Sequence, residues 1–200
     1  LQDGQPVRMS KRSGKAIALH DLLDEVSVDA ARYFFNSRSA TSPVDFDLDL
    51  AVREDSENPV YYVQYAHARI CSILRKAAGV TPEQAAEMGM DAVAAKAIGE
   101  NVDYALLTDP TELALSRKIS ELEDLIASCA RDRAPFRLTH FAEELAAGFH
   151  SFYQACQVLP SEGRPVEPEV TRARLAACDA VRSVLDLVLS LIGVSAPTKM

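Results

Sequence analysis

From residue 58 onward, apolar residues recur every three or four positions, which is the spacing of one face of an α-helix. The first such helix is expected to begin at Asn58-Pro59, where an N-capping residue precedes a proline suited to the first helical position. It is expected to end at Gly79, because glycine readily adopts the left-handed conformation that terminates helices. Its apolar face comprises Val63, Ala66, Ile70, Ile73 and Ala77.

Three further stretches keep the same period. Asp109-Pro110-Thr111-Glu112 resembles a capping box that opens one helix, Thr139 is a candidate N-cap for the next, and the last covers about residues 169–192. A weaker helical stretch covers residues 82–98 and contains Gly89. The apolar faces of the three strong stretches are Leu115, Ile119, Leu122, Ile126 and Cys129; Phe141, Leu145, Phe149, Phe152 and Cys156; and Leu175, Cys178, Leu185, Val188 and Ile192. The pattern predicts a bundle of about four long helices.

The first 57 residues show a mixed pattern. Asp3-Gly4 is typical of a hairpin turn, and residues 44–50 alternate apolar and acidic side chains as a half-buried strand does. Between them, apolar spacing predicts two short helices, the second N-capped by Ser27. The expected fold class is therefore mainly α: a helical bundle over residues 58–200, preceded by a small mixed α/β segment over residues 1–57.

The distribution of charge changes the conclusion drawn from its total. The protein has 200 residues, 48% of them hydrophobic, and a formal net charge of −8, which argues against nucleic-acid binding. However, residues 1–20 hold four basic and one acidic side chain, and residues 61–80 hold three basic and no acidic ones. Exposed charges act over only about 8 Å at physiological salt, so both stretches are candidate anion sites.

Other classes of protein are disfavoured by the same sequence. No run of 18 apolar residues is present to cross a membrane. The four histidines and four cysteines show no metal-ligand spacing, so no metal site is expected. The cysteines fall at apolar helix positions, which is typical of buried reduced thiols.

Residues 7–15 form a basic loop, Val7-Arg8-Met9-Ser10-Lys11-Arg12-Ser13-Gly14-Lys15. Its small residues allow backbone amides to approach an anion, and Lys11 supplies a mobile point charge for a phosphate. A solvated basic loop without a ligand is the alternative interpretation.

Tyr61, Tyr65, Arg69, Ser72 and Lys76 share one face of the helix that begins at residue 58. Tyrosine rings can stack on nucleobases, while arginine and lysine bind phosphates. The alternative is that the tyrosines pack at the edge of the bundle and the cations extend into solvent.

Arg8-Met9-Ser10-Lys11-Arg12 resembles the Lys-Met-Ser-Lys-Ser signature of class I aminoacyl-tRNA synthetases. The resemblance implies that Arg8, Ser10, Lys11 and Arg12 bind ATP, and that Lys11 stabilises the transition state as pyrophosphate leaves. Arg8 and Arg12 depart from the signature: Arg8 keeps the positive charge of the first lysine, but its guanidinium presents a planar fork of donors where lysine presents a point charge.

Three ordered matches extend the resemblance over the whole chain. Residues 58–70, Asn-Pro-Val-Tyr-Tyr-Val-Gln-Tyr-Ala-His-Ala-Arg-Ile, are similar to the entry helix of the arginyl-tRNA synthetase anticodon-binding domain. Residues 29–35, Asp-Ala-Ala-Arg-Tyr-Phe-Phe, are similar to the segment after the signature loop of that family. Residues 191–200 resemble its Leu-Gly-Ile-x-x-Pro-x-x-Met ending. The chain thus resembles the C-terminal part of an arginyl-tRNA synthetase, with a helical domain of the DALR type.

The resemblance implies the activity of a longer parent protein. That parent would use ATP, with Mg, to form arginyl adenylate and would then transfer arginine to tRNA. The His-Ile-Gly-His signature of the family does not occur in these residues, so we expect the fragment alone to be inactive and to bind no cofactor tightly. The chain also opens on Leu1 without an initiator methionine, which suggests a piece of that longer protein.

The family resemblance carries Tyr65 and Arg69 over as contacts to anticodon bases, and Tyr153 and Met200 as further contacts. Tyr61 and Lys76 are added from helix geometry. The expected partner is arginine tRNA, with no DNA and no membrane, in the cytoplasm. Two alternatives remain open here: the related domain of cysteinyl-tRNA synthetase, and a helical protein-interaction module.

Overall fold

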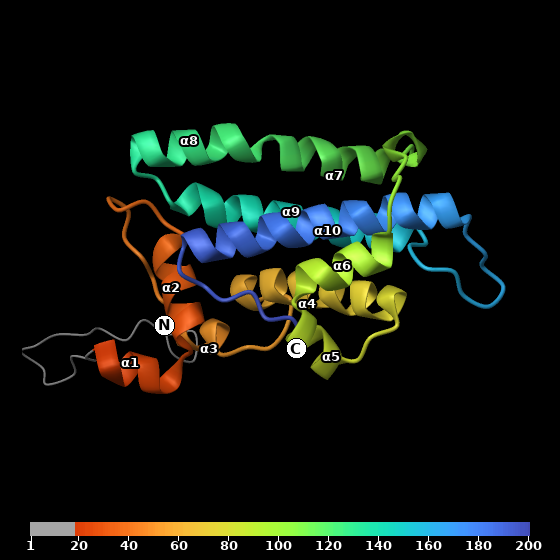
Figure 1. Cartoon of the computed structure of the whole chain (residues 1–200). Helices are drawn as coiled ribbons and strands as arrows, with labels where there is room; N and C mark the ends of the chain where they lie inside the picture. The colour runs from red at the N-terminus through yellow and green to blue at the C-terminus, as the bar shows by residue number, and fades with distance from the viewer. Residues whose placement is uncertain (1–18) are drawn as a thin grey trace, which may run out of the picture.

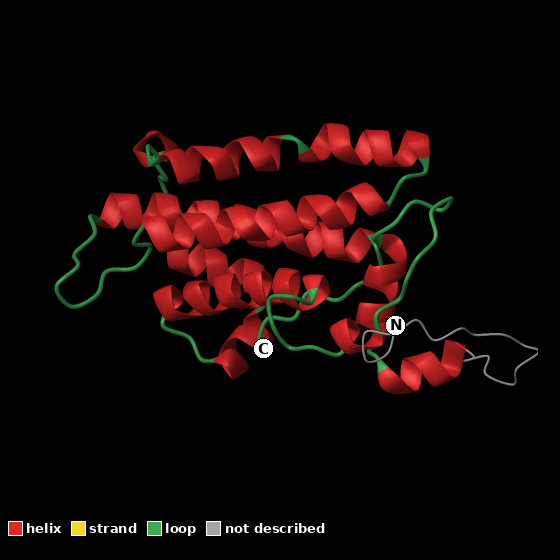
Figure 2. Cartoon of the chain, turned by 180° about the vertical axis from the view of Figure 1, so that it is seen from behind, coloured by secondary structure: helices red, strands yellow, loops and turns green. Residues whose placement is uncertain are grey.

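Helices make up the regular structure of the computed structural model, which describes residues 19–200. Within that range the only strand-type pairing is an isolated bridge between Ser161 and Arg164, and Figure 2 shows helices joined by loops. The elements are α1 (Leu19–Glu25), α2 (Val28–Asn36), α3 (Leu48–Ala51), α4 (Pro59–Ala78), α5 (Pro82–Met88), α6 (Met90–Ile98), the short 3-10 helix η2 (Tyr104–Leu106), α7 (Pro110–Ser120), α8 (Leu122–Asp132), α9 (Phe136–Ala155) and α10 (Pro168–Leu191). The prediction of a mainly helical bundle is confirmed.

The long helices α4, α9 and α10 pack against one another and form the centre of the bundle (Figure 1). Helices α7 and α8 follow each other along an outer layer that covers α9, and α6 packs on α4 and α10. Helix α2 contacts both α4 and α9. Its Tyr33 is fully buried and its hydroxyl donates to the Thr139 carbonyl and the Glu143 carboxylate, at 3.1 and 3.0 Å. Helix α2 is therefore fixed to the bundle by packing and by buried polar contacts.

The apolar periodicity correctly identified the core of the three central helices. The expected inward positions of α9 and α10 are all buried, and on α4 only Ala77 is partly exposed. On the outer layer, Leu115 and Cys129 are buried and the positions between them are partly buried. The single helix expected there is divided at Glu121, which ends α7 and begins α8.

Helix boundaries follow the expected capping chemistry at several points. The Asn58 side chain accepts from the Val60 N–H at 3.2 Å, and its amide donates to two carbonyls of the preceding segment. Gly79 ends α4 at φ +63°, a conformation that side chains with a Cβ rarely adopt. Ser27 accepts from Ala30 N–H at 3.0 Å, as predicted.

The strand predicted over residues 44–50 is wrong. Asp47 instead N-caps α3, accepting from the Leu50 N–H at 3.1 Å. Phe46, Leu48 and Leu50 do pack against the core, so the alternation correctly predicted which side chains face inward. A strand also needs a partner for its backbone groups, and none exists among residues 19–200, whereas aspartate readily caps a helix. The mixed α/β character of the first segment is therefore not observed in its described part.

Thr139 does not cap a helix, because α9 begins three residues earlier at Phe136. Pro135 has φ −61°, a value already suited to a helix start, and Thr139 is buried in the first turn, where its hydroxyl donates to the Phe136 carbonyl. The weak stretch over residues 82–98 is two helices, separated at Gly89 with φ +79°. The predicted hairpin at Asp3-Gly4 lies outside the described residues.

A buried ion pair joins α7 to α10. Glu112 is 1% exposed; its Oε1 lies 2.7 Å from Nε of Arg174, and its Oε2 accepts from the Asp109 N–H at 2.9 Å. The expected capping box is thus confirmed, and the same carboxylate holds an arginine. Removing it would leave both donors without their partner.

We expect Glu112→Ala to lower the free energy of unfolding by about 2–3 kcal/mol, because a charge is left in a mostly buried position and a helix cap is lost. Urea denaturation followed by circular dichroism measures this change. Glu100→Ala, in the exposed loop after α6, is the matched control and should stay within about 0.5 kcal/mol of the wild type. Equal stability of the two variants would contradict a structural role for the pair.

Candidate nucleic-acid interface

The outer face of α4 presents aromatic rings followed by a cation. The rings of Tyr61 and Tyr65 lie one helical turn apart, with centroids 6.2 Å apart and planes within 8° of parallel. One turn further, the Arg69 guanidinium carbon lies 5.8 Å from the centre of the Tyr65 ring, and its Nη1 donates to the Tyr65 hydroxyl at 3.4 Å. The i, i+4 spacing noted in the sequence therefore produces a continuous surface.

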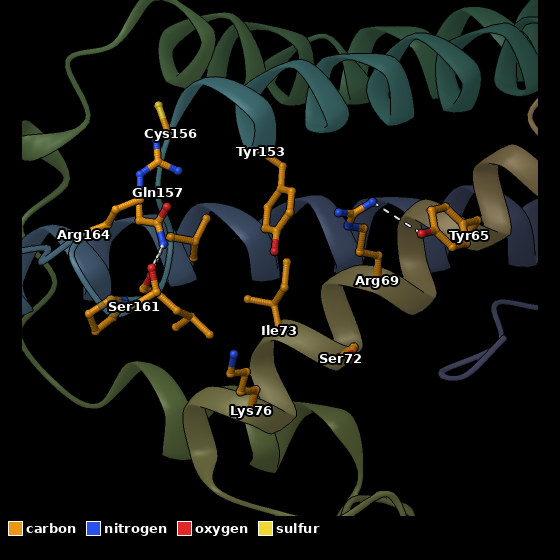
Figure 3. A pocket seen from close by; sticks show the side chains of 13 residues that line it. Tyr65, Arg69, Ser72, Ile73, Lys76, Tyr153, Cys156, Gln157, Ser161 and Arg164 are labelled. Carbon is orange, nitrogen blue, oxygen red and sulfur yellow. Dashed lines mark hydrogen bonds between the residues drawn. The ribbon is translucent and has the colours of Figure 1, made fainter.

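Helix α9 completes this surface from the other side. The Arg69 guanidinium carbon lies 4.6 Å from the centre of the Tyr153 ring, so that Figure 3 shows the arginine between two tyrosines. Cation–π attraction holds such a guanidinium in place without neutralising its charge. We call Tyr65, Arg69 and Tyr153 the aromatic ridge.

Two hollows flank the aromatic ridge, and Tyr65 and Arg69 line both. The larger, about 580 Å³, is the cationic hollow, since Lys76 and Arg164 join Arg69 in its lining (Figure 3). The smaller, about 420 Å³, is the aromatic hollow. Besides the two shared residues, it is lined by Ser56, Tyr61, Tyr62, His150 and Gln154.

The aromatic hollow is nearly uncharged. The His150 ring lies 5.0 Å from the Tyr62 ring and 6.1 Å from that of Tyr65. Burial, and then the nearby charge of Arg69, lower the pKa of His150, while burial raises the pKa of Tyr62. Arg69 is therefore the one charge in the lining of this hollow at neutral pH.

The arrangement of rings and cations has the chemistry of a site for single-stranded nucleic acid. Ring faces and a guanidinium stack with bases, and cations bind phosphates. Among residues 19–200, no cluster of His, Cys, Asp and Glu side chains could hold a metal ion, and no helix is long and apolar enough to cross a membrane. The four cysteines are buried and unpaired, and burial raises the pKa of Cys71 to about 11 and of Cys178 to about 12, which favours the protonated form of these two thiols at neutral pH.

A family model for the DALR anticodon binding domain matches residues 63–200 of this chain. The chain belongs to this family. The match agrees with the DALR-type helical domain that the sequence motifs predicted.

This DALR-domain chain is 47% identical over 199 residues to the arginine–tRNA ligase of Bacillus cereus and 49% identical over 200 residues to that of Symbiobacterium thermophilum. Both alignments cover 100% of this chain and 33% of the relative, so the chain spans about one third of the length of the curated relatives it matches. The predicted resemblance to arginyl-tRNA synthetases is confirmed.

Solved structures agree with the fold. A putative arginyl-tRNA synthetase from Campylobacter jejuni superposes with a TM-score of 0.74 at 29% identity, over 100% of this chain and 39% of that one. The arginyl-tRNA synthetase of Thermus thermophilus superposes with a TM-score of 0.72 at 22% identity, over 100% of this chain and 34% of that one. At its lower identity, the second comparison supports the fold alone.

The DALR domain brings most of the predicted anticodon contacts together. Tyr61, Tyr65, Arg69 and Tyr153 form one surface, and Lys76 lines the cationic hollow beyond it. Met200 is half exposed and lies apart from the ridge, in a third hollow of about 360 Å³ that it shares with Tyr61 and Gln64. The predicted ATP-binding residues Arg8, Ser10, Lys11 and Arg12 lie outside the described residues.

Sequence reasoning missed three residues of this surface. His150 precedes Tyr153 by three positions on α9, so helical spacing alone could have placed it beside that tyrosine. Gln154 lines the aromatic hollow, and Arg164 lines the cationic one from the loop after α9. Nothing in the sequence indicated that this loop reaches α4.

The C-terminal tail of the domain is bound along another face of α4. The Gln64 amide donates to the Ser195 carbonyl at 2.9 Å, and Arg75 Nη1 donates to the Thr198 carbonyl at 2.7 Å. Between them, His67 Nδ1 lies 2.9 Å from the Pro197 carbonyl, which can only accept, so Nδ1 carries the proton. Buried polar side chains thus determine where Met200 lies.

His67 makes this attachment sensitive to pH. Burial lowers the pKa of His67, although the Pro197 carbonyl favours its protonated form. The unfolded chain therefore binds a proton at this residue first as the pH falls below about 6.5, and the free energy of unfolding decreases there.

We expect the free energy of unfolding to fall between pH 7.0 and pH 5.5, by at most about 1.4 kcal/mol per pH unit for each such histidine. His67→Gln should make this dependence shallower, whatever its effect on stability at pH 7. Urea titrations at a series of pH values measure the slope, with His140→Gln, an exposed histidine of α9, as control. A slope unchanged in His67→Gln would contradict the assignment.

Proposed function

We propose that this chain is the anticodon-binding part of an arginine–tRNA ligase and binds the anticodon loop of arginine tRNA. The observation that carries the proposal is the aromatic ridge, in which a guanidinium lies between two tyrosine rings on a DALR domain. The relatives are named arginine–tRNA ligases, which supports arginine tRNA as the partner.

The geometry suggests how an anticodon loop binds. Unpaired bases expose ring faces and hydrogen-bonding edges, which a paired stem conceals. Tyr65 is 38% exposed, so part of its ring is accessible to a base beside Arg69. Tyr61 and Tyr153 extend the stacking surface on either side, and Met200 supplies an apolar contact near Tyr61. The expected substrate is RNA rather than DNA.

The proposal extends to the longer parent protein. We assign residues 1–57 to the end of its catalytic half and residues 58–200 to the anticodon-binding domain. In the parent, Arg8, Ser10, Lys11 and Arg12 would contact ATP, and Lys11 would stabilise the charge that develops as pyrophosphate leaves. Arginine and Mg would be bound by the parent, and its place of action would be the cytoplasm.

The two alternatives have less support. The relatives named above are arginine–tRNA ligases, and the family match specifies an anticodon-binding domain. A protein-interaction module would not require a guanidinium placed between two tyrosine rings.

Binding of a synthetic anticodon stem-loop of arginine tRNA tests the proposal. We expect the wild type to bind the native loop more tightly than a loop with the middle anticodon base changed. Tyr65→Ala and Arg69→Ala should each weaken binding of the native loop by about 1–3 kcal/mol, the usual contribution of a stacked base. Fluorescence anisotropy gives the dissociation constants.

Tyr104→Ala is the matched control, since Tyr104 is 63% exposed on η2 and lines neither hollow. It should bind as the wild type does. If the wild type binds native and altered loops equally, the chain does not read the anticodon and the proposal is overturned.

The chain alone should not activate arginine, because the His-Ile-Gly-His signature of the family's nucleotide-binding fold is absent from its sequence. Arginine-dependent exchange of pyrophosphate into ATP should stay at background with the purified 200-residue protein. Exchange above background that is lost in Lys11→Ala would show that the chain carries its own catalytic site.

A further inference from the structure

The cationic hollow contains positive charge without any compensating acid. Arg69, Lys76 and Arg164 are in its lining, which includes no aspartate or glutamate, although the protein has a net charge of −8. Among residues 19–200, none of the three cations forms an ion pair. Three unneutralised cations around one hollow favour an anionic ligand.

The loop that carries Arg164 is held in shape by its own contacts. The Gln157 amide donates to the Leu159 carbonyl at 2.7 Å and to the Ser161 hydroxyl at 3.1 Å. Ser161 and Arg164 exchange backbone hydrogen bonds at 3.1 and 2.9 Å, across a turn in which Gly163 has φ +73°. Arg164 therefore sits at the end of a closed turn rather than on a free segment.

The buried ion pair of the fold also positions this loop. Arg174 Nη1 donates to the Gln157 carbonyl at 2.8 Å while its Nε binds Glu112. The loop is thus attached to α7 and α10, and it faces Lys76 of α4 across the hollow (Figure 3). Because the backbone that carries Arg164 is held in advance, less conformational entropy is lost when this residue binds a ligand than if it lay on a free segment.

We propose that the cationic hollow binds the phosphate backbone of the RNA strand whose bases stack on the aromatic ridge, with Lys76 and Arg164 as the phosphate contacts. This inference rests on the proposed function. It divides the surface by chemistry: the aromatic hollow, with one shared cation, takes neutral bases, and the cationic hollow takes phosphodiesters. Lys76 and Arg164 then supply affinity that is independent of the anticodon sequence.

The salt dependence of binding separates phosphate contacts from base contacts. Lys76→Gln and Arg164→Gln should each reduce the slope of log K against log salt by about 0.7–0.9, because one fewer counterion-releasing contact is made. Between about 50 and about 200 mM salt, each variant should therefore lose about 3-fold less affinity than the wild type loses. The ratio of affinities for native and altered anticodon loops should remain that of the wild type. Arg164→Lys, which keeps the charge, should retain the wild-type slope.

Arg117→Gln is the control, since Arg117 is exposed on α7 and lines neither hollow; its slope should equal that of the wild type. If the wild type distinguishes the anticodon loops but Lys76→Gln and Arg164→Gln both keep the wild-type salt slope, the inference is overturned and the proposed function stands. A variant that loses anticodon discrimination with an unchanged slope would show a base contact and would also overturn it. A wild type that does not distinguish the anticodons overturns the proposed function and this inference together.

Discussion

Three faces of helix α4 have different surroundings, and the rest of the structure depends on keeping all three in place at once. One face, which includes Ile70, is buried in the core. A second face holds the C-terminal tail through His67 and Arg75, and a third presents the exposed Tyr65 and the half-buried Arg69. Because 3.6 residues per turn fix the angles between these faces, α4 cannot rotate to improve one contact without losing the others. The orientation of the ridge is therefore determined by the packing of the core.

The ion pair of Glu112 and Arg174 has a similar double role on the opposite side of the hollow. Taking two charges out of water costs free energy that their attraction repays only when the remaining donors are satisfied. Here the carboxylate also accepts from a helix N-terminus, and the guanidinium also donates to the Gln157 carbonyl. The pair consequently places the loop of Arg164 as well as joining two helices. A hydrophobic pair in the same place could supply stability but not that attachment.

The parts of the molecule that were predictable from the sequence are those determined by neighbours within one or two helical turns. The spacing of Tyr65 and Arg69 was sufficient to place them together, since a helix fixes their separation. The alternation over residues 44–50 correctly predicted which side chains are buried, but it predicted a strand where the chain forms a short helix. A strand depends on a partner far away in the sequence, whereas the helix cap at Asp47 depends only on neighbouring residues. Arg164 could not be found from the sequence, since its position beside α4 depends on contacts between three separate segments.

The net charge of −8 is compatible with the proposed RNA surface because the linings of both hollows contain no carboxylate. At physiological salt, a charge exposed more than about 8 Å away is largely screened, so the acidic segments elsewhere do not cancel the local positive field. Close to them, those segments repel a polyanion. Specificity is a difference between affinities, and repulsion at wrong sites increases it as effectively as attraction at the right one. On the proposed function, the acidic segments therefore act against misplaced RNA rather than against RNA as such.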